Sequence, residues 1–243
     1  LRTAHFPNHN DDIEPARVRL AFDELFLLSL ALEDKKRREQ EFKAPVMSAK
    51  GRPTELLKTL PFPLTGAQAR VWKEIQADIA AGKPMRRLVQ GDVGSGKTVL
   101  AALSLAAAVE AGWQGALMAP TEILAEQHLK TLRLWLEPLG VEVLSLTQAQ
   151  KGKGRKEVLA HLASGQPLVA VGTQALIQKG VEFGHLGLVV TDEQHRFGVM
   201  QRLTLTKKSQ EQPHSLVMTA TPIPRTLAMT AYGDLDGSIV DEL

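Results

Sequence analysis

Residues 88–101 read LVQGDVGSGKTVLA, an apolar strand candidate joined to a helix candidate through a short loop that holds three glycines. Together with the Lys-Thr pair that follows, these glycines satisfy the pattern G-x-x-x-x-G-K-[ST]. Glycine permits backbone dihedrals that other residues avoid, so N–H groups can point inward around phosphate oxygens, and the helix that begins near Lys97 adds the positive end of its dipole. The stretch therefore predicts a triphosphate cradle, in which Lys97 reaches the β- and γ-phosphates and the Thr98 hydroxyl binds Mg²⁺. The predicted cradle consists of Gly91, Gly94, Ser95, Gly96, Lys97 and Thr98.

A second part of the same site is predicted at residues 186–198, LGLVVTDEQHRFG, an apolar strand that ends in two adjacent carboxylates. Asp192, at the carboxyl end of the strand, is placed to hold Mg²⁺, and Glu193 can polarise the attacking water as a general base. Two adjacent acids can also form a solvated turn, but a phosphate loop earlier in the same chain favours the catalytic interpretation. We therefore predict Lys97, Asp192 and Glu193 as catalytic residues, with Thr98 and Asp192 as metal ligands.

Two residues upstream of the phosphate loop are candidates for reading the base of a nucleotide. The segment FPLTGAQ places Phe62 and Gln68 on either side of a helix start that Thr65 is predicted to cap. An aromatic ring can stack on adenine, and an amide can offer it a paired donor and acceptor. A glutamine at such a position is also common on an ordinary protein surface.

The composition excludes several other classes of protein. The chain has 243 residues, of which 44% are hydrophobic and 23% charged, and 29 basic against 27 acidic residues leave a formal charge of +2. Any contact with nucleic acid must therefore be local. Cysteine is absent, which excludes disulfides and thiolate metal sites. The apolar run at 25–32 is too short to cross a bilayer and no signal peptide is visible, so we expect a cytoplasmic protein with no membrane partner. The chain begins with Leu rather than Met, and we expect it to be a piece of a longer polypeptide.

The chain is predicted to have three parts. Residues 1–45 contain a long helix, because apolar residues recur at three- and four-residue spacing between positions 18 and 32. Residues 46–64 hold several prolines and are predicted to be a connector. From residue 65 to 243, short apolar strands alternate with helices, which predicts an α/β domain with a mostly parallel sheet covered on both faces. The predicted strands are 88–90, 116–119, 141–146, 168–171, 188–191 and 215–219, and the predicted helices after the loop are 97–111, 122–136, 155–164 and 224–231.

Five segments, taken together, resemble motifs of the superfamily 2 helicases and translocases. They are GDVGSGKT (91–98), APTEILAEQ (119–127), VGTQAL (171–176), DEQH (192–195) and TATPIPRT (219–226). The run DEQHRFGVMQR followed by MTATPIPRTLAMTAYGDLD resembles the RecG-type bacterial DNA helicases, which remodel stalled forks and branched recombination intermediates. The resemblance runs from about residue 13 to the end of the chain, and it departs from the family at Gln174, where histidine is usual. Translocases of the transcription–repair coupling type share several of these motifs and are the alternative.

The resemblance implies a RecA-like P-loop NTPase fold, ATP and Mg²⁺ as ligands, and forked or branched DNA as partner. It implies backbone contacts to DNA from Thr121, Glu122, Gly172 and Thr173, and coupling between nucleotide and DNA through Thr219 and Thr221. The small and hydroxyl side chains suit phosphate contacts, and an aromatic content of only 5% argues against a ladder of base-stacking platforms. It also implies that a second RecA-like lobe and a wedge domain belong to the same polypeptide but not to these residues. We therefore expect this piece to hydrolyse ATP barely, if at all.

Two other classes of protein could use the same cradle. A switch GTPase would need a guanine-reading N-K-x-D, which the sequence lacks, and a P-loop kinase would need a substrate lid. A non-catalytic, nucleotide-gated binding module would not depend on Glu193.

Overall fold

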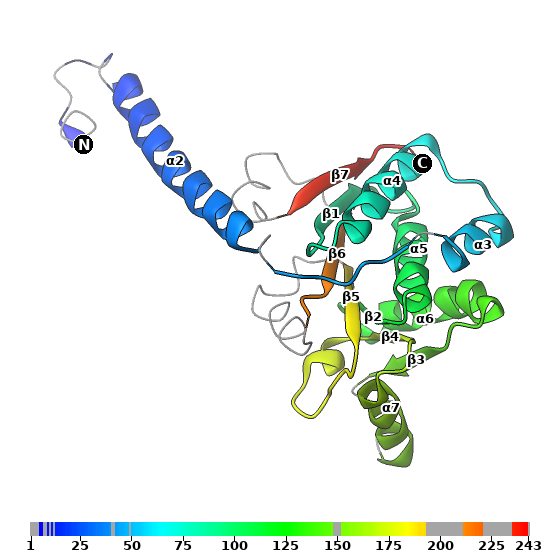
Figure 1. The fold of residues 1–243 in the computed structure, drawn as a ribbon. Coiled ribbons are helices and arrows are strands. Elements are labelled where there is room, and N and C mark those ends of the chain that lie inside the picture. The colour runs from blue at the N-terminus through cyan, green and yellow to red at the C-terminus, as the bar shows by residue number, and fades with distance from the viewer. Residues whose placement is uncertain are drawn as a thin grey trace. The chain divides into compact units, whose positions relative to one another are not determined.

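A computed structural model of the chain describes residues 5–6, 9, 11, 13–39, 42–48, 50–147, 152–192, 211–220 and 235–242. These residues form two compact units. One contains the helix α2 (Ile13–Glu39), and the other contains a sheet with the remaining helices (Figure 1).

Helix α2 confirms the long N-terminal helix that the apolar spacing predicts. It runs for 27 residues and carries an Arg19–Asp23 ion pair one turn apart. The apolar side chains that define the predicted stripe are largely uncovered within this unit: Val18 is 60% exposed and Phe22 57%.

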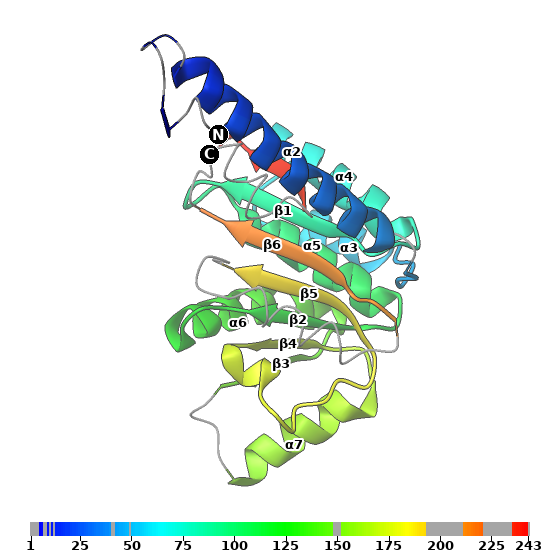
Figure 2. The same ribbon diagram turned by 90° about the vertical axis from the view of Figure 1, so that its left-hand side faces the viewer.

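In the second unit, seven described strands form one parallel sheet in the order β3-β4-β2-β5-β6-β1-β7 (Figure 2). Strands β1 and β2 are not neighbours, because β5 and β6 lie between them. The segments that leave β1 and β5 therefore emerge on either side of β6. This order confirms the predicted fold class. The strands are β1 Arg86–Gly91, β2 Gln114–Met118, β3 Val143–Leu146, β4 Val169–Gly172, β5 Leu186–Asp192, β6 His214–Thr219 and β7 Asp236–Val240.

Both faces of the sheet are covered, which explains why its strands read as short continuous apolar runs. One face is covered by α7 (Gly152–Ser164) and the short helix η3 (Gln174–Ile177), which pack on the smaller core. Alternate residues of a strand serve the two sides: Leu117 lies in the larger core, whereas Ala116 and Met118 lie in the smaller one. Four of the described helices pack on the larger core (Figure 1), and they are α3 Arg52–Thr59, α4 Gly66–Ala80, α5 Lys97–Glu110 and α6 Glu122–Leu136, the last followed by the 3-10 turn η2 Glu137–Leu139.

Helices α4 and α5 position the phosphate loop. Helix α5 is the central helix of this layer, and every residue from Val99 to Val109 is buried. Helix α4 begins with a capping box, in which the Thr65 hydroxyl accepts from Gln68 N and Gln68 Oε1 accepts from Thr65 N, at 3.3 and 3.0 Å. The predicted cap at Thr65 is therefore confirmed.

The structure contains a helix that the sequence analysis did not predict, α3, within the proline-rich segment 46–64. Proline occupies the first turn of this helix, where its missing N–H costs nothing, and Leu56 is fully buried. Met47, from the same segment, is also in the core, at 1% exposure. The segment connects two parts of the chain while it packs on α5, because short apolar stretches between its prolines have a surface to bury against. The predicted domain boundaries stay predictions.

Strand β7 was also not predicted, because it lies at the edge of the sheet and only two of its five residues are buried. A charged cluster attaches it to α4. Arg87 of β1 donates from Nε to Asp78 Oδ2 at 2.7 Å, and from a terminal nitrogen to Glu74 Oε2 at 2.8 Å and to Ser238 Oγ at 2.6 Å. Ser238 lies 151 positions from Arg87 in the sequence, so no local pattern predicts that this strand joins the cluster.

No helix in the described part of the chain combines the length and apolar character that crossing a bilayer requires. The predicted helix at 224–231 lies outside the described residues.

Candidate functional site

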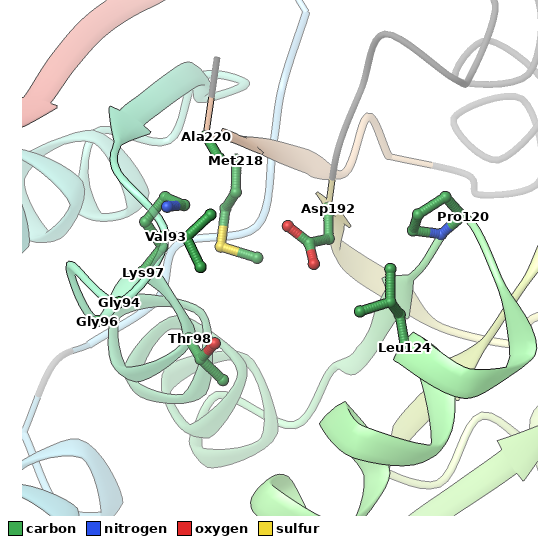
Figure 3. Close-up of a pocket in the computed structure, with 10 residues that line it drawn as sticks. All are labelled: Val93, Gly94, Gly96, Lys97, Thr98, Pro120, Leu124, Asp192, Met218 and Ala220. Atoms are coloured by element: carbon green, nitrogen blue, oxygen red, sulfur yellow. The ribbon is translucent and has the colours of Figure 1, made fainter. Parts of the chain in front are cut away.

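A pocket of about 490 Å³ lies at the carboxyl ends of the central strands. Ligands of open parallel sheets bind at this edge, where segments leaving non-neighbouring strands diverge. Here the phosphate loop follows β1, Asp192 ends β5, and Met218 of β6 lies between them (Figure 3). The lining residues are Val93, Gly94, Gly96, Lys97, Thr98, Pro120, Leu124, Asp192, Met218 and Ala220.

The phosphate loop has the backbone geometry that its glycines predict. Gly94 and Gly96 have φ values of 92° and 78°, in the left-handed region that side chains with a Cβ rarely adopt. Gly96 is also the N-cap of α5, and no described side chain caps this helix end. The amino end of α5 therefore faces the loop, and the positive end of the helix dipole suits an anion there.

The Lys97 ammonium turns back on its own loop. Its Nζ donates to Gly91 O at 2.5 Å and to Asp92 O at 2.7 Å, with Ser95 Oγ at 3.5 Å. These neutral carbonyl partners keep the cation at the entrance of the loop. Phosphate oxygens carry negative charge, so they attract an ammonium more strongly than neutral carbonyl oxygens do.

Gln68 reaches the loop from α4, whereas Phe62 does not line the pocket. Gln68 is buried, and its Nε2 donates to Ser95 O at 2.9 Å while its Oε1 completes the capping box. A Cβ at Gly96 would collide with this amide, so the loop and Gln68 are packed tightly together. The ring of Phe62 instead lies edge-on to Trp135 of α6, with the ring centroids 6.2 Å apart. The structure therefore brings only one of the two predicted base-reading residues to the phosphate loop.

Asp192 and Thr98 face the same cavity from opposite walls (Figure 3). The partner of Asp192 among the described side chains is His128 of α6, whose Nε2 lies 2.6 Å from Asp192 Oδ2. The sequence analysis missed His128. Its only local signal is the spacing of four residues from Leu124, which puts both side chains on one face of α6.

Three further predicted or noted residues lie outside the described part of the chain: the predicted general base Glu193, its neighbour His195, and the predicted coupling residue Thr221. The other coupling residue, Thr219, ends β6 beside Gln90 of β1 and is 2% exposed.

The predicted DNA-contacting residues lie in two loops at the same edge of the sheet. Thr121 caps α6, its hydroxyl accepting from Leu124 N at 3.3 Å, and Glu122 is exposed in the first turn. Gly172 ends β4, Thr173 follows it, and both are buried. A Cβ at Gly172 would press against the Leu146 carbonyl, so close packing of β3 and β4 already requires glycine there.

The residues present suit a nucleotide with a divalent cation. Carboxylate and hydroxyl oxygens, the donors that magnesium prefers, come from Asp192 and Thr98 within one pocket, next to an uncapped helix end and a lysine. Magnesium usually takes only one or two protein oxygens together with phosphate oxygens. The two oxygen donors from Thr98 and Asp192 match this number.

The fold and the site define the class of protein: a P-loop nucleoside triphosphatase domain with a RecA-like parallel sheet. The chain belongs to the DEAD/DEAH box helicase family, whose model matches residues 65–230. Helicase domains of this family use a nucleotide, which agrees with the phosphate loop.

Curated proteins of high similarity carry a more specific name. The ATP-dependent DNA helicase RecG of Escherichia coli (strain K12) is 53% identical over 254 residues, covering 100% of this chain and 37% of the relative. RecG of Bacillus subtilis (strain 168) is 49% identical over 245 residues, covering 100% of this chain and 36% of the relative. The chain thus spans just over a third of the length of these relatives. The predicted resemblance to RecG-type helicases is confirmed.

Solved structures agree with the sequence comparison. A structure of RecG bound to a three-way DNA junction matches with a TM-score of 0.83 and 42% identity, covering 99% of this chain and 32% of that chain. A hypothetical ATP-dependent RNA helicase from Sulfolobus tokodaii matches with a TM-score of 0.56 and 18% identity, covering 79% of this chain and 57% of that chain. The second match shows the shared fold alone.

Proposed function

We propose that this chain is the first ATP-binding motor lobe of an ATP-dependent DNA helicase that remodels stalled replication forks and branched recombination intermediates. The observation that carries the proposal is the common pocket of the phosphate loop and Asp192. A motor needs both, because a phosphate grip without an opposing metal acid holds a nucleotide but does not activate its terminal phosphate. The names of the relatives support an ATP-dependent DNA helicase, and the three-way junction in the RecG structure supports branched DNA as the substrate.

In this proposal the residues around the pocket divide the work. Lys97 leaves its loop carbonyls to contact the β- and γ-phosphates, and Thr98 and Asp192 hold Mg²⁺. The bound ion supplies charge neutralisation on the phosphates. Glu193 accepts a proton from the attacking water as general base. Gln68 is the stronger of the two adenine contacts, since it already touches the loop through Ser95, and Phe62 is the outer one.

The DNA strand runs over the carboxyl edge of the sheet in this proposal. Thr121, Glu122, Gly172 and Thr173 offer hydroxyl and backbone groups to phosphates without reading bases. Thr219 and Thr221 connect the nucleotide pocket to this surface. Binding by this chain alone is expected to be weak and to fall steeply with salt.

The remaining parts of the machine belong to the same polypeptide in this proposal: a second RecA-like lobe and a wedge domain that recognises branches, all acting in the cytoplasm. The second lobe supplies an arginine finger, which in such enzymes contributes about 10³–10⁵ in rate. The isolated chain therefore binds ATP or ADP weakly and hydrolyses it barely. Robust DNA-stimulated hydrolysis by these 243 residues alone would contradict this assignment.

The test is the ATPase rate of the complete polypeptide on forked and on linear duplex DNA of equal length. We expect stimulation by the fork to exceed stimulation by the linear duplex, and Glu193→Gln to abolish turnover while ATP stays bound. Equal stimulation by both DNAs would favour a translocase of the transcription–repair coupling type. Unchanged function in Glu193→Gln would instead indicate a nucleotide-gated binding module.

A further inference from the structure

Asp192 is held by His128, a residue that has no role in the proposed binding of nucleotide or DNA. The two side chains are 11% and 14% exposed, and Nε2 and Oδ2 are 2.6 Å apart. They are 64 positions apart in the sequence, so the contact exists only because α6 packs at the carboxyl end of the sheet. A bond of this length from an N–H to a carboxylate has a narrow geometry and therefore orients both groups.

His128 interrupts an apolar stripe of α6. Leu124, His128 and Leu132 follow one another at intervals of four and lie on one face of the helix. Leu124 lines the pocket and Leu132 is fully buried. A polar ring in such a stripe needs a hydrogen-bond partner, and an apolar residue would suit the packing better. Asp192 is that partner, which explains why a histidine is tolerated here.

The contact leaves the second carboxylate oxygen of Asp192 for the cavity. An imidazole with a proton on Nε2 donates to Oδ2, and Oδ1 is not part of this bond. The carboxylate itself points into the space between Thr98 and Leu124 (Figure 3). Carboxylates that bind metal ions are commonly held by an outer partner in this way, and losing that partner typically costs 10–100-fold in metal affinity or activity.

We propose that His128 is the positioning residue of Asp192, fixing its carboxylate in the orientation that binds the magnesium ion of a bound nucleotide. This role rests on the proposed function, because it requires a magnesium–nucleotide complex in the pocket. It assigns no contact between His128 and the nucleotide. Removing the donor therefore weakens only the part of nucleotide binding that depends on Mg²⁺.

The test measures binding of a fluorescent ADP analogue to the full chain, first in EDTA and then across a Mg²⁺ titration. His128→Ala is expected to bind the analogue in EDTA as the unsubstituted chain does, while its apparent dissociation constant for Mg²⁺ rises about 10–100-fold. His128→Gln restores an N–H near the position of the imidazole Nε2 and is expected to recover most of the Mg²⁺ affinity. His128→Asn has the same chemistry but a shorter reach, and is expected to behave like the alanine variant.

The matched control is a second histidine–carboxylate pair, His161 and Glu142. Its two atoms are 3.3 Å apart, its side chains are about half exposed, and neither lines the pocket. His161→Ala should leave the Mg²⁺ titration unchanged. The Asn and Gln variants of His128 keep a polar side chain in the stripe, so their comparison remains decisive if His128→Ala does not fold.

Each outcome separates this role from the proposed function. If the unsubstituted chain shows no Mg²⁺-dependent binding, the nucleotide site itself is wrong and the role of His128 fails with it. If that binding is present and the His128 variants show the same Mg²⁺ midpoint, the nucleotide site stands, and His128 serves only to pack α6. If the Gln variant recovers and the Asn variant does not, His128 positions Asp192.

Discussion

Buried polar side chains have different roles at the amino ends and at the carboxyl ends of the strands, here called the amino edge and the carboxyl edge of the sheet. At the amino ends of the strands, Gln114 of β2 and His214 of β6 are both completely buried. The Gln114 amide donates to Leu162 O at 2.9 Å and accepts from His185 N at 3.0 Å. His214 accepts from Met85 N at 2.9 Å, and its Nε2 lies 2.7 Å from Pro45 O. Each of these side chains bridges two main-chain segments.

At the carboxyl ends, polar side chains line a cavity instead. Lys97 is held by carbonyls of a glycine loop, Asp192 has one oxygen against His128, and Thr98 faces the same space. At the amino edge the hydrogen-bond partners are main-chain groups packed in the interior. At the carboxyl edge the partners lie beside a pocket, so a ligand can replace them. We infer that buried polar side chains stabilise the fold at the amino edge and bind the ligand at the carboxyl edge. Four substitutions test this difference.

The largest effect is expected at the carboxyl edge from Lys97→Ala. Loss of a charged group that contacts phosphates in the transition state should lower the ATPase rate of the complete polypeptide by about 10²–10³-fold. Because the contacts of the Lys97 ammonium to Gly91 O, Asp92 O and Ser95 Oγ lie within its own loop, their loss should hardly move the thermal midpoint. Lys130→Ala, an exposed lysine of α6, is the control and should change neither quantity. A large loss of stability in Lys97→Ala would show that the loop lysine is structural.

The next largest effect is expected at the amino edge from Gln114→Leu. Leucine keeps the volume but leaves the Leu162 carbonyl and the His185 N–H without their partner, at about 1–3 kcal/mol for each group. Urea denaturation should therefore show a loss of about 2–6 kcal/mol, with nucleotide affinity unchanged in the folded protein. The exposed Gln166→Leu is the matched control and should stay near the unsubstituted value. A Gln114 variant that loses nucleotide binding at full stability would break the comparison.

A smaller, pH-dependent effect is expected at His214. Burial lowers the pKa of this imidazole below its ordinary value of 6.5, although the Pro45 carbonyl and Asp78 act in the opposite direction. The unfolded chain therefore takes up a proton more readily than the folded one as the pH falls. Stability from this residue is fully present above pH 6.5 and is lost as the pH drops through the lowered pKa, by at most about 1.4 kcal/mol per pH unit.

The measurement is the free energy of unfolding at several pH values between about 7.5 and 5, the range in which histidine titrates. His214→Gln should be less stable at neutral pH but should show a shallower fall towards acid. His161→Ala removes an exposed histidine and is the control. An equal slope in the His214 variant would mean that other groups account for the acid sensitivity.

The smallest effect is expected from Thr65→Ala, which removes a cap at the carboxyl edge. The capping box of α4 belongs to the scaffold, so the cost should be about 1 kcal/mol of stability. Thr65→Ser retains the hydroxyl and should be close to the unsubstituted chain in a thermal melt. A drop in the ATPase rate as large as that expected for Lys97→Ala would mean that the cap controls the loop through Gln68.

Local patterns predicted much of this molecule. The loop after β1, the cap of α4 and the position of Asp192 at the end of β5 follow from residues within a few positions of one another. The helix α3 and the strand β7 were missed for a physical reason. A short helix among prolines and a half-exposed edge strand acquire their stability from α5, α4 and β1, which lie elsewhere in the sequence.

The site shows the same division. Lys97 and Thr98 lie in the predicted loop, and Asp192 lines the pocket with them, but Phe62 packs on Trp135 and the need for glycine at position 172 is explained by the Leu146 carbonyl. No sequence motif predicts His128 as a partner of Asp192. Its role could be read only after the two were found 2.6 Å apart.

The sequence by itself determined that a phosphate loop sits between a strand and a helix, because glycine dihedrals and helix ends are properties of neighbouring residues. It also determined a parallel sheet, because strands buried on both faces read as apolar runs. Only the tertiary structure decided which strands are neighbours, and so which side chains meet across the pocket. That choice depends on packing between distant segments, for which the chain carries no local signal.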